Sequence, residues 1–213
     1  MVQIIPAILS TTEADFERDI SRLKQSSSFK EGWVHIDFAD NIFVRNKTIE
    51  SSVVAKYPIE LHKEAHLMVS HPLEWIDDLV ETIFERIIFH IEAKDDTKKC
   101  IEYIKNKGLQ VGLAINNETP IERLEQFIDG VAVVLVMAIV PGFQGQEFIP
   151  ASLDKIRNLK SRGWKVLVGV DGAVKDDNIK KIVNSGADFV IVGSYLLKGD
   201  IDENLENLWE RIK

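Results

Sequence analysis

The sequence is poor in several features that would each point to a particular class of protein. Cysteine occurs once in 213 residues, at Cys100, so the chain can form neither an internal disulfide nor a thiolate cluster for zinc. No run approaches the roughly 18 apolar residues that a membrane-spanning helix needs. Lys and Arg (26) are outnumbered by Asp and Glu (34), which does not suit binding to nucleic-acid phosphates. We therefore expect no membrane and no nucleic-acid partner.

The start of the chain also lacks a targeting pattern. Residues 1–6 contain no basic segment followed by a long apolar core, so the sequence predicts no signal peptide and a cytoplasmic location. What is present is ordinary for a globular protein, with 45% hydrophobic and 28% charged residues. A chain of this length can bury one good core, and we expect a single domain over residues 1–213.

Strand-like apolar runs alternate with amphipathic, helix-like segments along the whole chain. The pattern predicts strands at 2–9, 33–38, 60–69, 86–91, 111–115, 131–137, 165–170 and 188–192. It predicts helices at 11–24, 50–56, 72–80, 95–106, 120–127, 150–161, 175–185 and 202–212, the first capped by Thr12. Parallel strands need crossover connections, so eight such units predict a (β/α)₈ barrel. An open doubly wound sheet is the alternative.

The second predicted strand ends with two polar side chains on one face. Residues two apart in a strand project to the same side, so His35 and Asp37 stand together. Such a pair is typical of a metal site or an acid–base pair, although a buried structural pair gives the same pattern. His66 and Asp171 lie at the ends of two further strands, and all four can converge in a closed barrel. These groups suit one divalent ion: zinc, iron, manganese or cobalt.

Small residues follow the last three predicted strands. The loop at 140–146 is rich in glycine, Gly172 and Ala173 follow the seventh strand, and Gly193 and Ser194 follow the eighth. Barrels commonly build a phosphate site from these turns, although plain connecting turns have a similar composition. A metal beside a phosphate site favours a small sugar phosphate as ligand.

Several motifs occur in the order found in one known family. Over essentially its whole length the chain resembles the ribulose-phosphate 3-epimerases. The blocks that carry the resemblance are Pro6-Ala7-Ile8-Leu9-Ser10, His35-Ile36-Asp37, His66-Leu67-Met68-Val69, Pro141-Gly142-Phe143, Val170-Asp171-Gly172 and Val192-Gly193-Ser194.

The resemblance implies a metal-dependent epimerase that inverts C3 of a ketose phosphate. The default substrate pair is D-ribulose 5-phosphate and D-xylulose 5-phosphate. The metal would be held by His35, Asp37, His66 and Asp171, and Asp37 and Asp171 would be the two acid–base catalysts, acting through an enediolate. The residues expected to contact substrate are Ser10, His66, Met68, Met137, Gly142, Phe143, Gln144, Gly145, Gly172, Ala173, Gly193 and Ser194. We also expect a homo-oligomer, because apolar residues on barrel helices often dock copies of the same chain.

Six residues on the predicted working face depart from the family pattern and leave the substrate open. They are Ala39, Asn41, Ala138, Val140, Ala173 and Tyr195. A hexulose phosphate such as allulose 6-phosphate is one alternative, since Ala39 stands where a methionine would close the pocket. A barrel that binds a phosphosugar without turnover is another. Related barrel decarboxylases and aldolases use an Asp-x-Lys pair, and the alanine two residues after Asp37 argues against that chemistry.

Other polar residues are expected to play lesser parts. His90 and Glu92 alternate on the fourth predicted strand, where a structural or supporting role is favoured over ligation. His62 and His71 lie among surface-like residues, and Cys100 on its predicted helix is expected to be inert.

Overall fold

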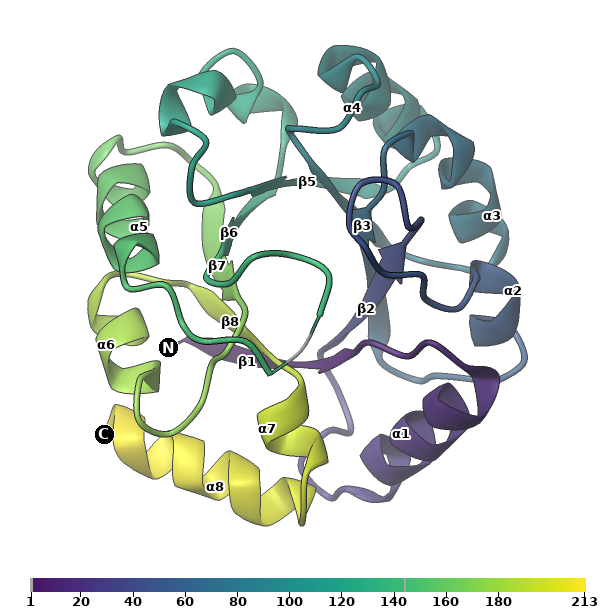
Figure 1. The fold of residues 1–213 in the computed structure, drawn as a ribbon, viewed down its shortest axis with the longest axis vertical. Helices are drawn as coiled ribbons and strands as arrows, with labels where there is room; N and C mark the ends of the chain where they lie inside the picture. Colours follow the sequence, from purple (N-terminus) through teal and green to yellow (C-terminus); the bar gives the residue numbers. More distant parts are fainter. Residues whose placement is uncertain (1, 144) are drawn as a thin grey trace.

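Eight parallel strands close into a barrel in a computed structural model that describes residues 2–143 and 145–213 (Figure 1). Each strand pairs with the next, and β8 pairs with β1 to complete the ring. The strands are β1 (Gln3–Ile8), β2 (Trp33–Ala39), β3 (His62–Met68), β4 (Arg86–His90), β5 (Gln110–Ile115), β6 (Val133–Met137), β7 (Leu167–Asp171) and β8 (Phe189–Val192). Closure confirms the predicted (β/α)₈ barrel and excludes the open sheet.

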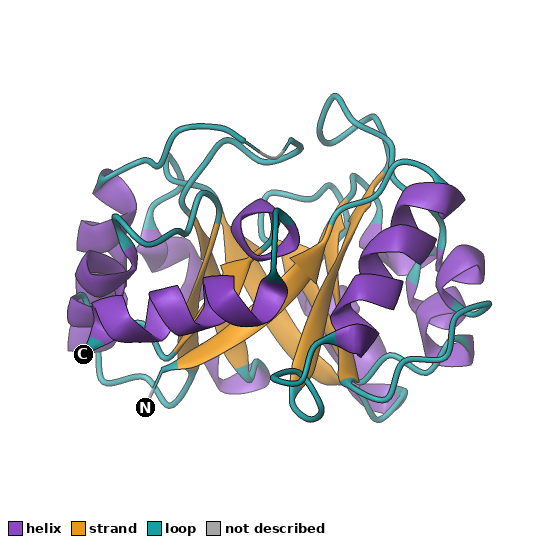
Figure 2. Cartoon of the chain, turned by 90° about the horizontal axis from the view of Figure 1, so that it is seen from below, coloured by secondary structure: helices purple, strands orange, loops and turns teal. Residues whose placement is uncertain are grey.

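Helices follow the strands and surround the barrel (Figure 2). They are α1 (Glu13–Gln25), α2 (Ser51–Val54), α3 (Ile76–Glu81), α4 (Thr97–Asn106), α5 (Ala151–Ser161), α6 (Ile179–Asn184), α7 (Ser194–Leu197) and α8 (Ile201–Ile212). Three short 3₁₀ segments are η1 (Pro72–Glu74), η2 (Ile121–Leu124) and η3 (Ile128–Gly130). The side chain of Thr12 accepts the N–H of Asp15 at 3.2 Å, which confirms the predicted cap of α1.

Two predicted helices differ from the observed structure. The prediction at 120–127 was wrong, because this segment forms η2 followed by a turn and buries only Ile121 and Leu124. The predicted helix at 72–80 is divided into η1 and α3, with Pro72 in the first position, where its missing N–H costs nothing. The short helix α7 was not predicted at all.

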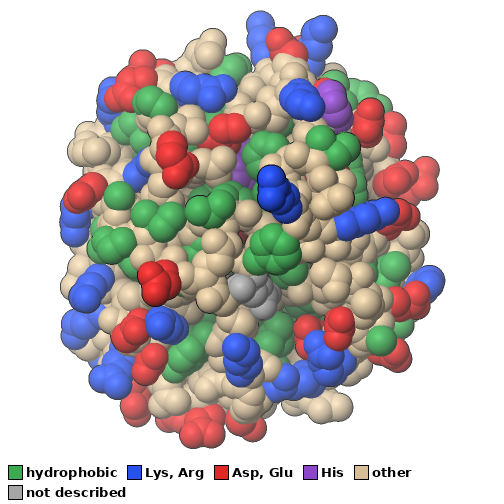
Figure 3. Space-filling model, in the orientation of Figure 1, with side chains coloured by type: hydrophobic (Ala, Val, Ile, Leu, Met, Phe, Trp, Pro, Cys, Tyr) green, Lys and Arg blue, Asp and Glu red, His purple; other side chains and the backbone are tan. Residues whose placement is uncertain are grey.

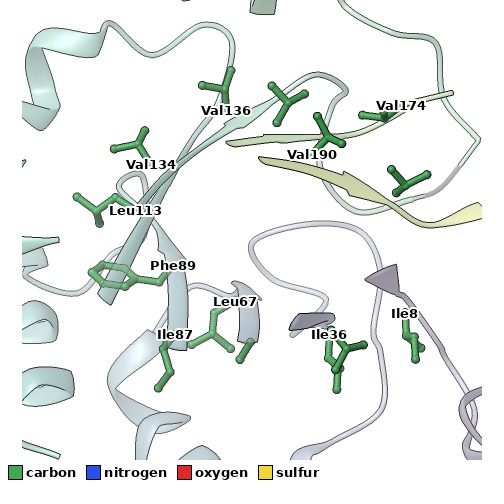
Figure 4. Close-up of a cluster of buried hydrophobic side chains, with 14 of the residues drawn as sticks. Ile8, Ile36, Leu67, Ile87, Phe89, Leu113, Val134, Val136, Val174 and Val190 are labelled. Carbon is green, nitrogen blue, oxygen red and sulfur yellow. The ribbon is translucent and has the colours of Figure 1, made fainter. Parts of the chain in front are cut away.

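The hydrophobic core has two layers, separated by the wall of the barrel. Ile36, Leu67 and Phe89 belong to the large cluster shown in Figure 4, which includes the buried faces of the helices. The smaller cluster fills the barrel and consists of Ile5, Ala7, Ile88, Ala114, Val133, Leu135, Met137, Phe189 and Ile191. Since neighbouring strand residues alternate between the layers, the polar residues on either side of Ile36 face the barrel interior.

The loops after β2 and β6 meet at the carboxyl end of the barrel. The β6–α5 loop crosses the mouth in Figure 1, and the side-chain N–H of Asn46 donates to the carbonyl of Gly142 at 2.6 Å. A Cβ on Gly142 would lie 2.9 Å from Cβ of Val44, so only glycine allows the two loops to approach this closely. Within the described ranges, no helix is long and apolar enough to cross a membrane.

Candidate active site

The four side chains predicted as metal ligands converge at the carboxyl ends of three strands. Parallel register pairs Asp37 of β2 with His66 of β3, and Asp171 is the last residue of β7. His66 Nδ1 lies 2.8 Å from Asp37 Oδ1 and 3.5 Å from Asp171 Oδ2. His35 Nε2 lies 3.4 Å from Asp37 Oδ1, and the four potential ligand atoms are all within 4.8 Å of one another. The barrel therefore brings the predicted group together.

An unpartnered nitrogen indicates that this group suits a cation. His35 is fully buried, and its Nε2 makes no hydrogen bond with any residue that the structure describes. A buried polar atom without a partner is costly unless something else binds it. Two imidazole nitrogens and two carboxylate oxygens form a donor set that zinc, iron, manganese and cobalt all accept. The residues present therefore fit a divalent metal ion.

Glu64 holds the other nitrogen of His35. The Nδ1–H of His35 donates to Glu64 Oε1 at 2.7 Å, and Arg86 Nη1 donates to Glu64 Oε2 at 2.7 Å. The guanidinium of Arg86 also lies over the Trp33 ring, 3.8 Å from its centroid. A carboxylate on the remote nitrogen fixes the imidazole so that Nε2 faces the ligand group. The sequence analysis missed Glu64, although the alternation along β3 places it on the same face as His66.

Burial and charge separate the protonation behaviour of the two central carboxyls. Burial would raise the pKa of Asp37, but its close contacts with the imidazoles of His35 and His66 outweigh it and hold that pKa well below its usual range. Burial, reinforced by the charge of Asp37, raises the pKa of Asp171 to about 6. For His35, burial is likewise outweighed, and the Asp37 and Glu64 carboxylates raise its pKa well above the usual value. One carboxyl thus favours the ionised form, while the other can carry a proton near neutral pH.

A cavity of about 310 Å³ opens above this group. Its lining includes most of the residues predicted to contact substrate: Met68, Met137, Gly142, Phe143, Gly145, Gly172, Ala173, Gly193 and Ser194, together with Asp37 and Asp171. His35 and His66 are buried and do not line it, and Gln144 lies outside the described residues. The volume is at the lower end of the range for small-molecule sites.

Figure 3 shows the face of the molecule that carries the mouth of the barrel. Hydrophobic side chains gather towards the middle of this face, and charged side chains surround them. Large exposed hydrophobic residues in the loops after β2 and β6 include Ile42, Val140 and Phe143. The entrance to the cavity is therefore partly apolar.

Ser10 and Ala39 are not among the residues that line the cavity. Ser10 is buried, and its hydroxyl has no hydrogen-bond partner among the described residues, so its contact with substrate stays a prediction. Ala39 is buried on β2, with its N–H donating to the Thr48 hydroxyl at 2.9 Å. The extra space expected at Ala39 is therefore not part of the cavity that the structure forms.

Two lysines that the sequence analysis did not single out line the cavity, together with Tyr195, which it placed on the working face. Lys175 follows β7, and Tyr195 and Lys198 follow β8. Barrels commonly bind phosphate at the loops after the last two strands. The position of these lysines in those loops is therefore the sequence signal that could have identified them.

Two departures from the family pattern adopt a backbone conformation that favours glycine. Asn41 has φ 62° and Ala173 has φ 53°, both in the left-handed region. Asparagine adopts this region more readily than most other residues with a side chain. Gly172 also has a positive φ of 113°, and a Cβ there would lie 2.5 Å from Ile139 Cγ1. The turn after β7 therefore holds two successive residues, Gly172 and Ala173, with positive φ.

His90 and Glu92 lie behind the ligand group. His90 is fully buried, and burial lowers its pKa to about 4. Burial would raise the pKa of Glu92, but hydrogen bonding to His90 outweighs it and lowers that pKa to about 2. Near neutral pH these residues are therefore a neutral imidazole and a carboxylate.

The fold and the site together define the class of protein. It is a (β/α)₈ barrel in which acid–base groups that can hold a metal ion lie beside a small-molecule cavity at the carboxyl ends of the strands.

Comparison with known proteins identifies the family within this class. Residues 3–197 match the model of the ribulose-phosphate 3 epimerase family. The ribulose-phosphate 3-epimerase of Chlamydia pneumoniae is 34% identical over 93% of this chain and 89% of its own length. The enzyme of the same name from Escherichia coli is 36% identical over 90% of this chain and 87% of its own. The chain belongs to the ribulose-phosphate 3-epimerase family and is an isomerase of that type.

Comparison with solved structures supports the fold alone. The 3-hexulose-6-phosphate synthase of Salmonella typhimurium superposes with a TM-score of 0.71 at 15% identity, covering 99% of this chain and 98% of that one. The tryptophan synthase α-subunit of Pyrococcus furiosus gives a TM-score of 0.70 at 18% identity, with 98% of each chain covered.

Proposed function

We propose that this protein interconverts D-ribulose 5-phosphate and D-xylulose 5-phosphate by inverting C3. The observation that carries the proposal is the convergence of Asp37, Asp171 and two histidines beneath a cavity of about 310 Å³. Membership of the epimerase family and the names of the relatives support this substrate pair.

The two carboxyl groups suit a two-base reaction. Inverting a carbon next to a ketone requires one group to remove a proton from one face and another to return a proton to the opposite face. Asp37 comes from β2 and Asp171 from β7, so they can approach a substrate from different sides of the barrel. The low pKa keeps Asp37 ionised, the form that can take a proton, and the raised pKa of Asp171 lets it carry the proton that it donates in one direction. Their roles exchange in the reverse direction.

A divalent metal ion would be held by His35, Asp37, His66 and Asp171. When bound, it would stabilise the negative charge that develops on the oxygens of the substrate enediolate. Asp37 and Asp171 would remain beside C3, with the burial of the site limiting access of water.

The phosphate would lie in the part of the cavity that is lined by the turns after β7 and β8. The backbone at Gly172 and Gly193 lines this region, and small residues expose N–H groups that phosphate oxygens can accept. Lys175 and Lys198 line the same cavity and add positive charge to an otherwise acidic protein. The predicted contacts of Ser10, Met68, Met137 and Ser194 remain part of this proposal.

Two alternatives are kept because of the departures from the family pattern. A hexulose phosphate such as allulose 6-phosphate has one carbon more, and Ala138 and Tyr195 are among the changed residues near the cavity. A barrel that binds a phosphosugar without turnover would also retain the cavity. The presence of all four metal-binding and acid–base groups favours an active epimerase over this second alternative.

An assay with both sugars separates these functions. Purified protein is freed of metal, loaded in turn with zinc, iron, manganese or cobalt, and supplied with D-ribulose 5-phosphate or D-allulose 6-phosphate. We expect faster epimerisation of the pentulose, measured as kcat/KM. Faster turnover of the hexulose would reassign the substrate, and binding of both sugars without turnover under every metal would overturn the proposal.

A further inference from the structure

A second imidazole lies directly behind His66. His66 Nε2 is 3.0 Å from His90 Nε2, and both side chains are fully buried. His90 is the last residue of β4, the strand next to β3 in the barrel. Two imidazole nitrogens at this separation share one hydrogen, so one donates and the other accepts.

The partners of His90 allow it to accept a hydrogen bond from His66. His90 Nδ1 lies 3.3 Å from Glu92 Oε2, and Glu92 Oε1 accepts the N–H of Asn116 at 3.0 Å. A carboxylate accepts hydrogen bonds, so His90 can donate from Nδ1 to Glu92 and leave the lone pair of its Nε2 facing His66. In this arrangement His66 donates from Nε2.

This direction leaves the lone pair of His66 on the nitrogen that faces the ligand group. Nδ1 is the atom 2.8 Å from Asp37 Oδ1 and 3.5 Å from Asp171 Oδ2. In the other tautomer, Nδ1 carries the hydrogen, donates it to Asp37 and cannot bind a cation. When a cation takes Nδ1, His66 must carry its hydrogen on Nε2, and His90 is the residue that accepts it.

His90 is also shielded from the cavity. Its ring packs against Phe43, with centroids 4.8 Å apart, and it does not line the space where substrate would lie. Its influence on the reaction therefore passes through His66.

We propose that His90 is a positioning residue that holds His66 with Nδ1 available to the metal, and that Glu92 orients His90 in turn. This inference rests on the proposed metal centre. It gives the two histidines different supports: Glu64 contacts His35 directly, whereas a neutral imidazole stands between Glu92 and His66. Residues that orient a metal ligand in this way typically change metal affinity by about 10- to 100-fold when lost.

Metal affinity of paired variants tests the role of His90. Dissociation constants for zinc and cobalt are measured by competition with a chromophoric chelator in wild type, His90→Leu and His90→Gln. We expect His90→Leu to bind roughly 10- to 100-fold more weakly. His90→Gln should lie much closer to wild type, because its side-chain oxygen can accept the His66 hydrogen. His62→Leu is the matched control, since His62 also pairs with a carboxylate, Glu85 at 2.7 Å, but is exposed and remote from the cavity.

The tautomer of His66 provides a test that does not depend on how the variants fold. Nitrogen chemical shifts of the histidines in the zinc-loaded wild type should show His66 protonated at Nε2 and metal bound at Nδ1. Metal on Nε2 of His66, or equal affinity in wild type and folded His90→Leu, would overturn the inference. Failure of the wild-type protein to bind any metal would instead overturn the proposed metal centre.

Discussion

Asp37 and Asp171 are the same residue type in different surroundings. Asp37 lies between two histidines. Asp171 lies near the negative charge of Asp37, and the positive charges of His35 and His66 offset that repulsion and the effect of burial only in part. Alternation in one strand was enough to place His35 with Asp37. It could not show that Asp171 joins them, because that depends on contacts between distant strands, and the predicted barrel together with the family motifs supplied this expectation.

Asp171→Asn should remove turnover while leaving the fold intact. The amide keeps the shape of the side chain but cannot take or return a proton, so kcat should fall by at least about 10²- to 10⁴-fold. Activity and circular dichroism check the two parts of this expectation. Asp129→Asn, at an exposed position remote from the cavity, is the matched control. Unchanged turnover in Asp171→Asn would show that another group serves as the second base.

The raised pKa of Asp171 predicts how the stability of the metal-free protein depends on pH. Because the pKa is raised from 3.8 to about 6 on folding, the contribution of this group to stability is present below pH 3.8 and lost as pH rises through 6. The loss is up to roughly 3 kcal/mol of unfolding free energy.

Urea unfolding in the presence of a chelator checks this prediction. Between pH 4.5 and 7.5, Asp171→Asn should become progressively more stable relative to wild type, because the amide does not ionise. A constant difference across this range would contradict it. Adding metal should restore stability to wild type at the upper end, where the carboxylate is available as a ligand.

The supporting residues were predicted only in part. Glu64 was missed, and His90 was expected to have a structural or supporting role without its partner being identified. Both act through contacts across neighbouring strands, of 2.7 Å to His35 and 3.0 Å to His66. Strand alternation shows which face a side chain occupies, but register decides which neighbour it meets.

At the scale of elements, the strands were predicted more accurately than the short helices. A buried strand carries a continuous apolar run such as Val133–Met137, whereas a single helical turn such as α7 has too few residues to show a period. The 3₁₀ segments were hard to predict for the same reason. In η2, a single turn buries Ile121 and Leu124 without forming a regular α-helix.

The contact between β7 and β8 inside the barrel predicts a sensitive position. A Cβ on Gly169 would lie 2.2 Å from ring carbons of Phe189, so the ring occupies the space that any larger residue would need. Gly169→Ala should therefore lower the unfolding free energy by about 1–3 kcal/mol. Chemical denaturation measures the unfolding free energy. The double variant Gly169→Ala/Phe189→Leu should lose less unfolding free energy than the sum of the losses in the two single variants. Full additivity would show that the two residues do not compete for this space.

At the scale of the whole molecule, closure of the barrel creates the site. Three strands contribute its ligands, and β2 and β7 meet at the centre only because β8 pairs with β1. The repeated strand–helix pattern predicted this closure through the number of units. The pattern did not predict the size of the cavity or the lysines that line it, since both depend on how the loops fold over the mouth.

The expected homo-oligomer is a prediction at this scale. Ile83 and Leu167 are large hydrophobic residues that are at least half exposed, and a second copy of the chain could cover such residues. Light scattering coupled to size-exclusion chromatography should give a mass of two or more times 24.2 kDa. A monomeric mass at micromolar concentration would contradict this expectation.

The most direct test of the account follows the hydrogen at C3 of the substrate. Metal-loaded protein is incubated with D-ribulose 5-phosphate in D₂O, and the products are examined by proton and carbon NMR. If two carboxyl groups remove and return the proton, D-xylulose 5-phosphate should form with deuterium at C3, and Asp171→Asn should not form it. Product that retains its original C3 hydrogen, or exchange confined to C1, would contradict the two-base epimerase.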